Sequence, residues 1–214
     1  NATYSWKGRY TVNGTLRYEG TNGLGLSRQS RWLPTWNVSA AWNAHEEPWF
    51  EKKVGKVMSH FTFKASYSLT ADRPPVTNAL AIIKSITTWR YFTGNSETGL
   101  YRSNPANPDL TYEKKHELNL GVDIGFLKNR INLSVDWYKR NNYDLVGATA
   151  TDGTDGFSTK YGNVASMESN GLELSLTTNN IKTKNFTWTT NFIYSYIHNE
   201  ITDLKARTRM YGLV

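Results

Sequence analysis

Residues 116–140, HELNLGVDIGFLKNRINLSVDWYKR, alternate apolar and polar side chains on both sides of a short turn at 127–129. Leu, Val and Ile occupy every second position, and Glu, Asn, Asp and Ser lie between them. Successive side chains of a strand point to opposite faces, so the pattern predicts a hairpin with one apolar and one polar face. Each arm runs about ten residues, longer than the roughly 5–6 of an average strand. A tilted strand needs about 9–11 residues to cross a bilayer.

The same period of two recurs along the rest of the chain, with many aromatic residues at the apolar positions. Together with the 116–140 hairpin, these segments predict about eight strands of one design. The further segments are 4–6, 9–20, 34–44, 60–70, 170–178 and 185–197.

The connections between these strands are of two lengths that alternate along the chain. Short turns are expected at 7–8, 127–129 and 179–184, and long connections at 20–34, 71–114 and 144–166. A segment of medium length, 44–59, lies where the alternation would place a short turn. Outer-membrane barrels carry short turns on the periplasmic side and longer loops outside. We therefore expect 71–114 and 144–166 to be extracellular, and 44–59 and 179–184 to be periplasmic.

Composition agrees with strands that are apolar on one face only. The 214 residues are 38% hydrophobic and 14% aromatic, with 8 Trp and 13 Tyr, which suits a barrel with aromatic girdles. The longest aliphatic run, ALAII at 79–83, is far shorter than the roughly 20 residues of a membrane helix. The chain begins with Asn and has no visible signal peptide, so we expect a mature or internal piece of a protein.

Charge and residue chemistry exclude several classes of function. The net charge is +7, but Lys and Arg are scattered and form no basic stripe with stacking aromatics, so no nucleic-acid partner is expected. Without cysteine there is no disulfide framework and no thiol chemistry. His45, His60, His116 and His198 lack metal-ligand spacing. We expect no catalytic residues, no metal and no cofactor, and hence no enzyme.

The alternation assigns candidate residues to the two faces of the sheet. Charged residues on the polar face would line the lumen of a barrel. They either hold an internal plug through ion pairs and hydrogen bonds or contact a passing solute. The lumen- or plug-facing candidates are Arg9, Arg17, Lys64, Glu117, Asp123, Asp136 and Glu173. The lipid-facing candidates are Leu120, Val122, Leu133, Val135, Trp188 and Phe192.

Four aromatic residues in the long 71–114 connection are candidates for contact with a substrate or a lid. Trp89, Tyr91, Phe92 and Tyr101 could stack on sugar rings or grip peptide side chains. Packing within the loop is the alternative reading of the same residues.

Residues 104–146 read NPANPDLTYEKKHELNLGVDIGFLKNRINLSVDWYKRNNYDLV. This segment resembles the C-terminal barrel of SusC/RagA-type TonB-dependent outer-membrane transporters. Its first part fits the family pattern N-P-x-L-x-W-E, with Tyr112 at the Trp position. The matching residues there are Asn107, Pro108, Leu110 and Glu113. Further matches are Asn119, Gly121, Asp123, Leu127, Asn129, Arg130, Asp136, Tyr138, Asp144, Leu145, Asn170, Gly171 and Glu173. Leu33 and Ser68 depart from the usual Phe and Gly.

The resemblance implies an all-β, antiparallel transmembrane β-barrel, of which residues 1–214 are about eight strands. Barrels of this class have about 22 strands around a plugged lumen. The plug and N-terminal domains are then expected outside this piece. The resemblance also implies the bacterial outer membrane, with its lipid and lipopolysaccharide, a SusD-like lipoprotein lid, energy from TonB, and import of glycans or peptides. Two alternatives are a complete eight-stranded outer-membrane structural or adhesion barrel, and a soluble ligand-binding barrel or sandwich.

Overall fold

The computed structural model describes residues 1–74 and 79–205, and most of them lie in β-strands. Eight strands form one antiparallel sheet, which confirms the predicted number. In sheet order they are β1 (Ala2–Trp6), β2 (Tyr10–Gly20), β3 (Trp32–Asn43), β4 (Met58–Asp72), β7 (Glu113–Phe126), β8 (Ile131–Ala150), β9 (Thr159–Lys182) and β10 (Thr187–Leu204). A separate ribbon pairs β5 (Ile82–Arg90) with β6 (Asn95–Asn104). The short helices are α1 (Arg28–Arg31), the 3-10 helix η1 (Ala44–Glu46) and α2 (Pro48–Lys53).

The register of the sheet places apolar and polar positions on opposite faces, because directly paired residues point the same way. One row of partners is apolar from β3 to β10, and the neighbouring row is mostly polar. The apolar row is Trp42, Phe63, Val122, Val135, Leu174 and Tyr194. The neighbouring row is Ala41, Lys64, Gly121, Asp136, Glu173 and Ser195. The two-faced sheet predicted from the alternation is confirmed.

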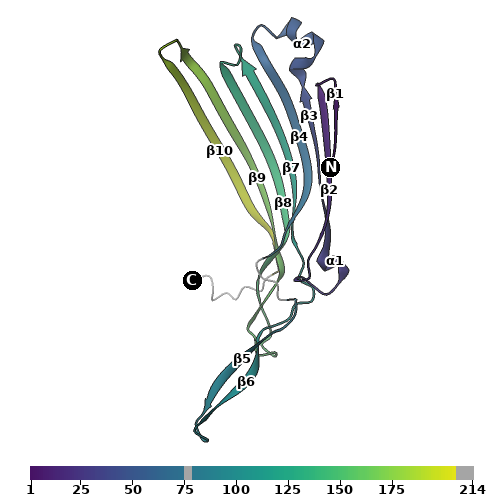
Figure 1. Cartoon of the computed structure of the whole chain (residues 1–214), viewed down its shortest axis with the longest axis vertical. Helices are drawn as coiled ribbons and strands as arrows, with labels where there is room; N and C mark the ends of the chain where they lie inside the picture. Colours follow the sequence, from purple (N-terminus) through teal and green to yellow (C-terminus); the bar gives the residue numbers. More distant parts are fainter. Residues whose placement is uncertain (75–78, 206–214) are drawn as a thin grey trace.

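Turns gather at one end of the sheet and loops at the other, as Figure 1 shows. The turn end carries residues 7–9, 44–57, 127–130 and 183–186, with α2 among them. The loop end carries 21–31, 73–74, 79–112 and 151–158, and the β5–β6 ribbon projects far beyond the sheet there. At the tightest turn, Lys7 and Gly8 have φ of 52° and 70°. Glycine suits this left-handed backbone conformation because it has no Cβ.

The limit of the apolar face nearest the loop end shifts steadily across the sheet. Counted from the turn end, the unbroken series of apolar residues on this face ends at Tyr18 on β2, Leu69 on β4, Leu118 on β7 and Trp137 on β8. Relative to the hydrogen-bonded rows, this limit moves six residues toward the turn end over four strand steps. With about 3.3 Å per residue and about 4.8 Å between strands, a level apolar band requires strands tilted by about 45°. This tilt is typical of barrels.

The predicted extent is wrong for the long connection at 144–166 and for the turn at 179–184, which is 183–186 because β9 continues to Lys182. The long connection expected at 144–166 is only 151–158, because β8 continues to Ala150 and β9 begins at Thr159. The connection at 71–114 contains the β5–β6 ribbon. In the medium segment at 44–59, η1 and α2 fill most of the chain.

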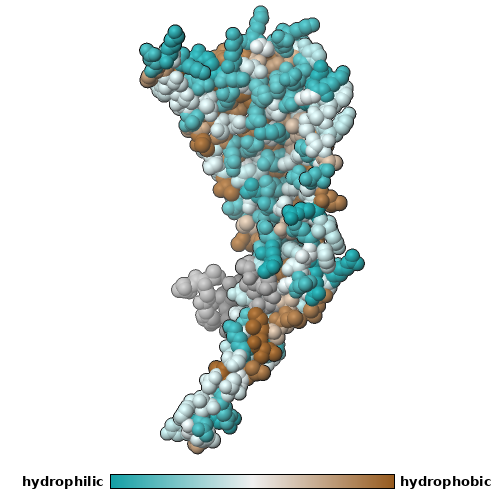
Figure 2. All heavy atoms as spheres, in the orientation of Figure 1, coloured by the Kyte–Doolittle hydropathy of each residue, from teal (hydrophilic) through white to brown (hydrophobic). Residues whose placement is uncertain are grey.

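The buried core is small and lies at the loop end. Leu24, Leu110 and Tyr112 are buried, and Leu33, Ala71 and Val146 pack against them. Among the described residues no helix is long and apolar enough to span a membrane. The rest of the sheet leaves both faces open, and the broad part in Figure 2 is largely hydrophilic, with hydrophobic patches toward its margins.

Candidate functional site

Charged side chains on the polar face pair with one another across the strands. Lys64 on β4 contacts Asp123 on β7, with 2.7 Å between Nζ and Oδ2. Glu117 lies 3.0 Å from Arg140 Nε and 3.3 Å from Lys115 Nζ. These pairs leave a polar wall whose charges are mostly balanced within the sheet.

The structure brings together four of the seven lumen candidates and separates the others. Lys64, Asp123, Asp136 and Glu173 lie in adjacent rows of the polar face, with Asp136 directly opposite Glu173. Their neighbours line a shallow hollow of about 390 Å³, which includes Lys64, Asn119 and Asp136. Two charged groups, Asp136 and Lys64, thus border a hollow on the face that a plug or a solute would meet.

The remaining lumen candidates lie away from this hollow. Glu117 lies four residue pairs nearer the loop end than Lys64, whose partner on β7 is Gly121. Arg17 pairs with Glu19 on the same strand, close to the loop end. Arg9 is in the first turn, where it lies 3.4 Å from Glu47. The alternation of apolar and polar residues predicts the face on which each residue lies but not its position between the turn end and the loop end.

All six lipid candidates fall on the apolar face. Val122 pairs with Val135, Leu120 with Trp137, and Phe192 with Leu176. Trp188 and Phe192 are each more than half exposed. So large an exposed apolar surface indicates contact with a membrane or a partner.

Aromatic side chains mark the part of this apolar face that is nearest the loop end. Tyr18 stacks on Trp32 at 5.2 Å between ring centroids. His116 lies between Tyr67 and Tyr143, at 5.7 Å and 5.6 Å and nearly parallel to both. Such aromatic belts are typical of the interfacial level of membrane barrels.

The four aromatic loop candidates lie on the β5–β6 ribbon but do not form one pocket. Tyr101 pairs with Lys84, which lies five residues before Trp89 on β5. Because side chains alternate between the two faces of a strand, Trp89 and Tyr101 lie on opposite faces of the ribbon. Tyr91 and Phe92 form the tip, where Phe92 is 99% exposed. They are therefore suited to contact with a large partner surface rather than to enclosing a small ligand.

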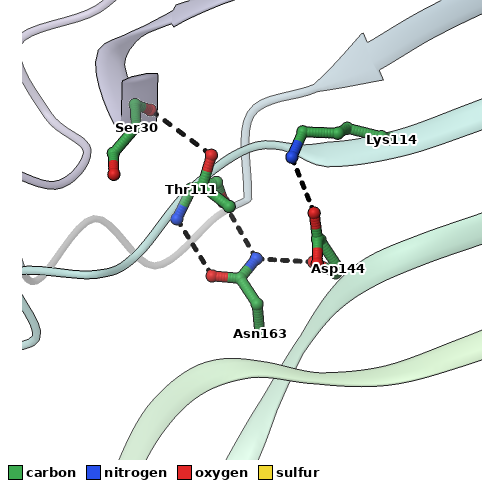
Figure 3. Close-up of polar contacts among 5 residues, drawn as sticks. All are labelled: Ser30, Thr111, Lys114, Asp144 and Asn163. Atoms are coloured by element: carbon green, nitrogen blue, oxygen red, sulfur yellow. Dashed lines mark hydrogen bonds and ion pairs between the residues drawn. The ribbon is translucent and has the colours of Figure 1, made fainter. Parts of the chain in front are cut away.

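A cluster of hydrogen bonds holds the loop end in place, as Figure 3 shows. The Asn163 side chain accepts from Thr111 N at 2.9 Å and donates to Thr111 O at 3.0 Å. The same amide donates to Asp144 O at 2.5 Å, and Asp144 pairs with Lys114 at 2.6 Å. Asp144 has a φ of 58°, at the irregularity where β8 and β9 shift register. Asn163 thus fixes the start of β7 against β8 and β9.

The family-like residues before β7 have structural roles beside this cluster. Asn107 donates to Tyr161 O at 2.7 Å, and Glu113 accepts from Val146 N at 2.7 Å. Leu110 is fully buried. Burial raises the pKa of the Tyr112 phenol above its usual value, with the nearby Glu19 carboxylate adding to the effect. The motif therefore specifies how a loop joins the sheet.

Metal-ligating side chains do not gather in the described residues. The rings of His45 and His60 are 4.2 Å apart, a contact that the sequence did not reveal, and His45 also lies near Glu46. Within 1–74 and 79–205, no group of three or more His, Cys, Asp or Glu residues could hold a metal ion.

A comparison of the chain with known protein families gives a result that agrees with the two-faced sheet. The family model described as "TonB dependent receptor-like, beta-barrel" matches residues 1–211. The chain belongs to this family. The fold class and the resemblance expected from the sequence are thereby confirmed. The family is one of receptors and transporters and is not an enzyme family.

Relatives named as TonB-dependent receptors match most of the chain. The chain is 30% identical to TonB-dependent receptor P39 of Formosa agariphila over 202 residues, 94% of this chain and 19% of that protein. It is 29% identical to TonB-dependent receptor SusC of Bacteroides thetaiotaomicron over 205 residues, 94% of this chain and 20% of SusC. The chain thus spans about a fifth of the length of these relatives.

Solved structures of this barrel family share the fold. The RagAB peptide transporter superposes with a TM-score of 0.81 at 24% identity, covering 94% of this chain and 22% of that chain. The siderophore receptor PirA from Acinetobacter baumannii gives a TM-score of 0.53 at 16% identity, covering 96% and 27%. The eight-stranded sheet therefore has the fold of part of a larger barrel.

Proposed function

We propose that residues 1–214 are part of the barrel domain of an outer-membrane transporter that imports glycans or peptides. The observation that carries the proposal is the open, tilted, two-faced sheet, which resembles about a fifth of the RagAB peptide transporter. Its apolar face meets lipid and, in the outer leaflet, lipopolysaccharide. Its polar face meets a plug domain that lies elsewhere in the longer protein, as does the N-terminal region that contacts TonB.

The balanced polar face supports a plug rather than a bare conduit wall. Lys64 with Asp123, and Glu117 with Arg140, already neutralise each other across strands. The hollow lined by Lys64, Asn119 and Asp136 then offers the Asp136 carboxylate and neighbouring polar groups to a polar domain seated against it. A plug held by such contacts can be shifted when TonB pulls, because each exposed pair contributes only about 0–1 kcal/mol.

The ribbon at the loop end supports an extracellular protein partner, for which we propose a SusD-like lipoprotein lid. A two-stranded ribbon is marginally stable alone, yet this one exposes Trp89, Leu100 and Phe92. Arg102 anchors its base by donating to Asp155 O at 3.0 Å, and its guanidinium lies 4.9 Å from the Phe157 ring centroid. The ribbon is thus held at its root and presents several exposed apolar side chains among polar ones.

The alternative function is a complete eight-stranded outer-membrane structural or adhesion barrel. Closure of such a barrel requires hydrogen bonds between the first and last strands. In the described sheet β1 and β10 are the two edges, at opposite ends of the strand order. This open order favours the larger transporter barrel.

Uptake by cells that make the full-length protein tests the transport proposal. Accumulation of labelled oligosaccharides and oligopeptides is compared between the parent strain, a strain lacking the protein, and a strain lacking TonB. We expect uptake of one of the two classes to be lost in both deletion strains. Unchanged uptake of both classes in the strain lacking the protein would contradict transport, and uptake that persists without TonB would contradict energisation.

A further inference from the structure

Net positive charge is concentrated at the turn end of the sheet. Here the turn end includes the last three residues of β9, so that it comprises residues 7–9, 44–57, 127–130 and 180–186; these carry nine basic side chains and three acidic ones, Glu46, Glu47 and Glu51. The basic ones are Lys7, Arg9, Lys52, Lys53, Lys56, Lys128, Arg130, Lys182 and Lys184. The other described residues carry 14 basic and 15 acidic side chains, so the turn end holds a net +6 and the remainder −1. Hydrophilic side chains project along this end in Figure 2.

These turn-end cations differ from the others in how they are neutralised. Elsewhere in the described chain, nine of the 14 Lys and Arg side chains lie within 4.0 Å of a carboxylate. At the turn end, Arg9 forms an ion pair with Glu47. Within residues 1–74 and 79–205, none of the seven turn-end lysines has such an ion pair. Their charge is therefore available to an anionic surface outside the sheet.

Apolar side chains accompany these lysines around the same end. Lys7 Nζ lies 4.9 Å from the Trp6 ring centroid, and Trp6 pairs with Tyr10 on the apolar face. Beside the lysines of 52–56, Trp49 and Val57 are exposed. Leu127 precedes Lys128, and Phe186 follows Lys184; both apolar side chains are more than half exposed. Lysines next to exposed aromatic and aliphatic groups are typical of segments at the headgroup level of a membrane.

We propose that the turn end binds the phosphate groups of anionic phospholipids in the adjacent membrane leaflet. This inference rests on the proposed membrane location of the apolar face. The best-formed site is a hollow of about 360 Å³ between the 127–130 turn and the end of β9, lined by Lys128, Asn129, Arg130, Asn179 and Lys182.

The cations that line this hollow have two different roles. Arg130 donates to Asn180 O at 2.9 Å and to Asn179 O at 3.3 Å, so its guanidinium joins the turn to β9. Lys128 is fixed at a φ of 58° by its N–H, which donates to Ser59 Oγ at 2.7 Å. Lys128 and Lys182 thus flank the hollow with two amino groups on an ordered backbone.

A binding measurement on the full-length protein in detergent tests the inference. Fluorescent phosphatidylglycerol is the probe, and fluorescent phosphatidylcholine, whose zwitterionic headgroup has no net charge, is the comparison. The test variant is K128Q/K182Q/K184Q, and the matched control K84Q/K160Q/K205Q removes the same charge at the loop end. We expect the test variant to weaken phosphatidylglycerol binding by at least about tenfold, since each lysine near an anionic surface contributes strongly. The control is expected to stay within about twofold, and added salt should weaken wild-type binding.

The possible results distinguish lipid binding from binding of a soluble anion. They also distinguish failure of the lipid inference from failure of the proposed function. Equal losses in the two variants, or equal binding of both lipids by the wild type, would overturn the inference. Full competition by millimolar inorganic phosphate would also overturn it, in favour of a soluble anion site. Absence of the wild-type protein from the outer-membrane fraction would contradict the proposed function itself. A protein that is correctly inserted and transports, but loses phosphatidylglycerol binding equally in both variants, would contradict the lipid inference alone.

Discussion

The ring of Tyr138 on β8 covers Gly171, its direct partner on β9. A Cβ at position 171 would overlap the Tyr138 ring and hydroxyl. The ring is 5% exposed, and the Arg140 guanidinium lies 4.0 Å from its centroid. Glycine in a strand often marks such a close approach. Both residues belong to the family-like pattern, which therefore records a packing requirement of the polar face.

Replacing Gly171 by Ala should destabilise the full-length barrel by about 1–3 kcal/mol, because a methyl group enters an occupied space. The matched control is Gly14→Ala on β2, where nothing lies within 4 Å of an added Cβ. Urea unfolding of the detergent-solubilised protein would measure both. Equal unfolding midpoints for the two variants would contradict the packing role.

Arginine substitutions on adjacent residues of β8 should distinguish the two faces. Val135 shares the apolar face with Val122 and Leu174, whereas Ser134 pairs with Asp123 and Ser175. Near the bilayer midplane, arginine on the lipid face costs about 2–4 kcal/mol. Val135→Arg should therefore lower the stability of the full-length protein more than Ser134→Arg. An equal loss, or a larger one at Ser134, would reverse the assigned faces.

The main sheet could be predicted from the sequence because one physical rule governs its membrane-facing part. Where one face meets lipid and the other a wet interior, apolar and polar residues must alternate, as they do from Leu118 to Phe126. Beyond Trp137 the same face of β8 carries Lys139 and Asn141. Both faces are wet there, so the alternation ends while the strand continues. This explains why 144–166 was predicted as a loop.

The ribbon and the hydrogen-bond cluster could not be predicted in this way. In β5, Ile82 and Ile83 are adjacent and Thr87 and Thr88 follow, so no period of two marks a strand. Asn163 contacts Thr111, 52 residues away, and an asparagine in a polar segment does not indicate its partner. The paired rings of His45 and His60 likewise depend on η1 bringing the chain back beside β4.

Cysteine labelling on whole cells should establish which end of the sheet is outside. Thr98 lies on the ribbon, Asp155 in the 151–158 loop, and Thr183 in the turn between β9 and β10. A membrane-impermeant thiol reagent is expected to label Thr98→Cys and Asp155→Cys in the full-length protein but not Thr183→Cys, because short turns of such barrels are periplasmic. The opposite labelling pattern would show that the orientation is inverted.

Loss of the Asn163 amide should loosen the loop end without disrupting the barrel. Asn163→Ala removes two hydrogen bonds to Thr111 and one to Asp144 O. Buried or half-buried groups left unpaired cost about 1–3 kcal/mol. We expect faster proteolysis within 105–112 of the folded full-length protein. Asn191→Ala, at an exposed position on β10, is the control, and equal cleavage rates in the two variants would argue against the role of Asn163.

Residues 1–214 produced alone should not form a closed barrel. Strand number, tilt and stagger are linked in a barrel, and an interior of about eight strands is just wide enough for its own side chains. That interior would have to accept charged residues of the polar face, including Lys64, Asp136 and Glu173, and burying charges without full pairing is costly.

If the sheet stays open instead, the edges at β1 and β10 leave backbone groups unpaired, which a hydrocarbon environment does not tolerate. The isolated piece is therefore expected to aggregate. Refolding it in detergent and comparing boiled with unboiled samples by gel mobility and circular dichroism provides the measurement. A discrete, heat-modifiable monomer rich in β-structure would favour the complete eight-stranded barrel, since only a closed sheet satisfies both edges at once.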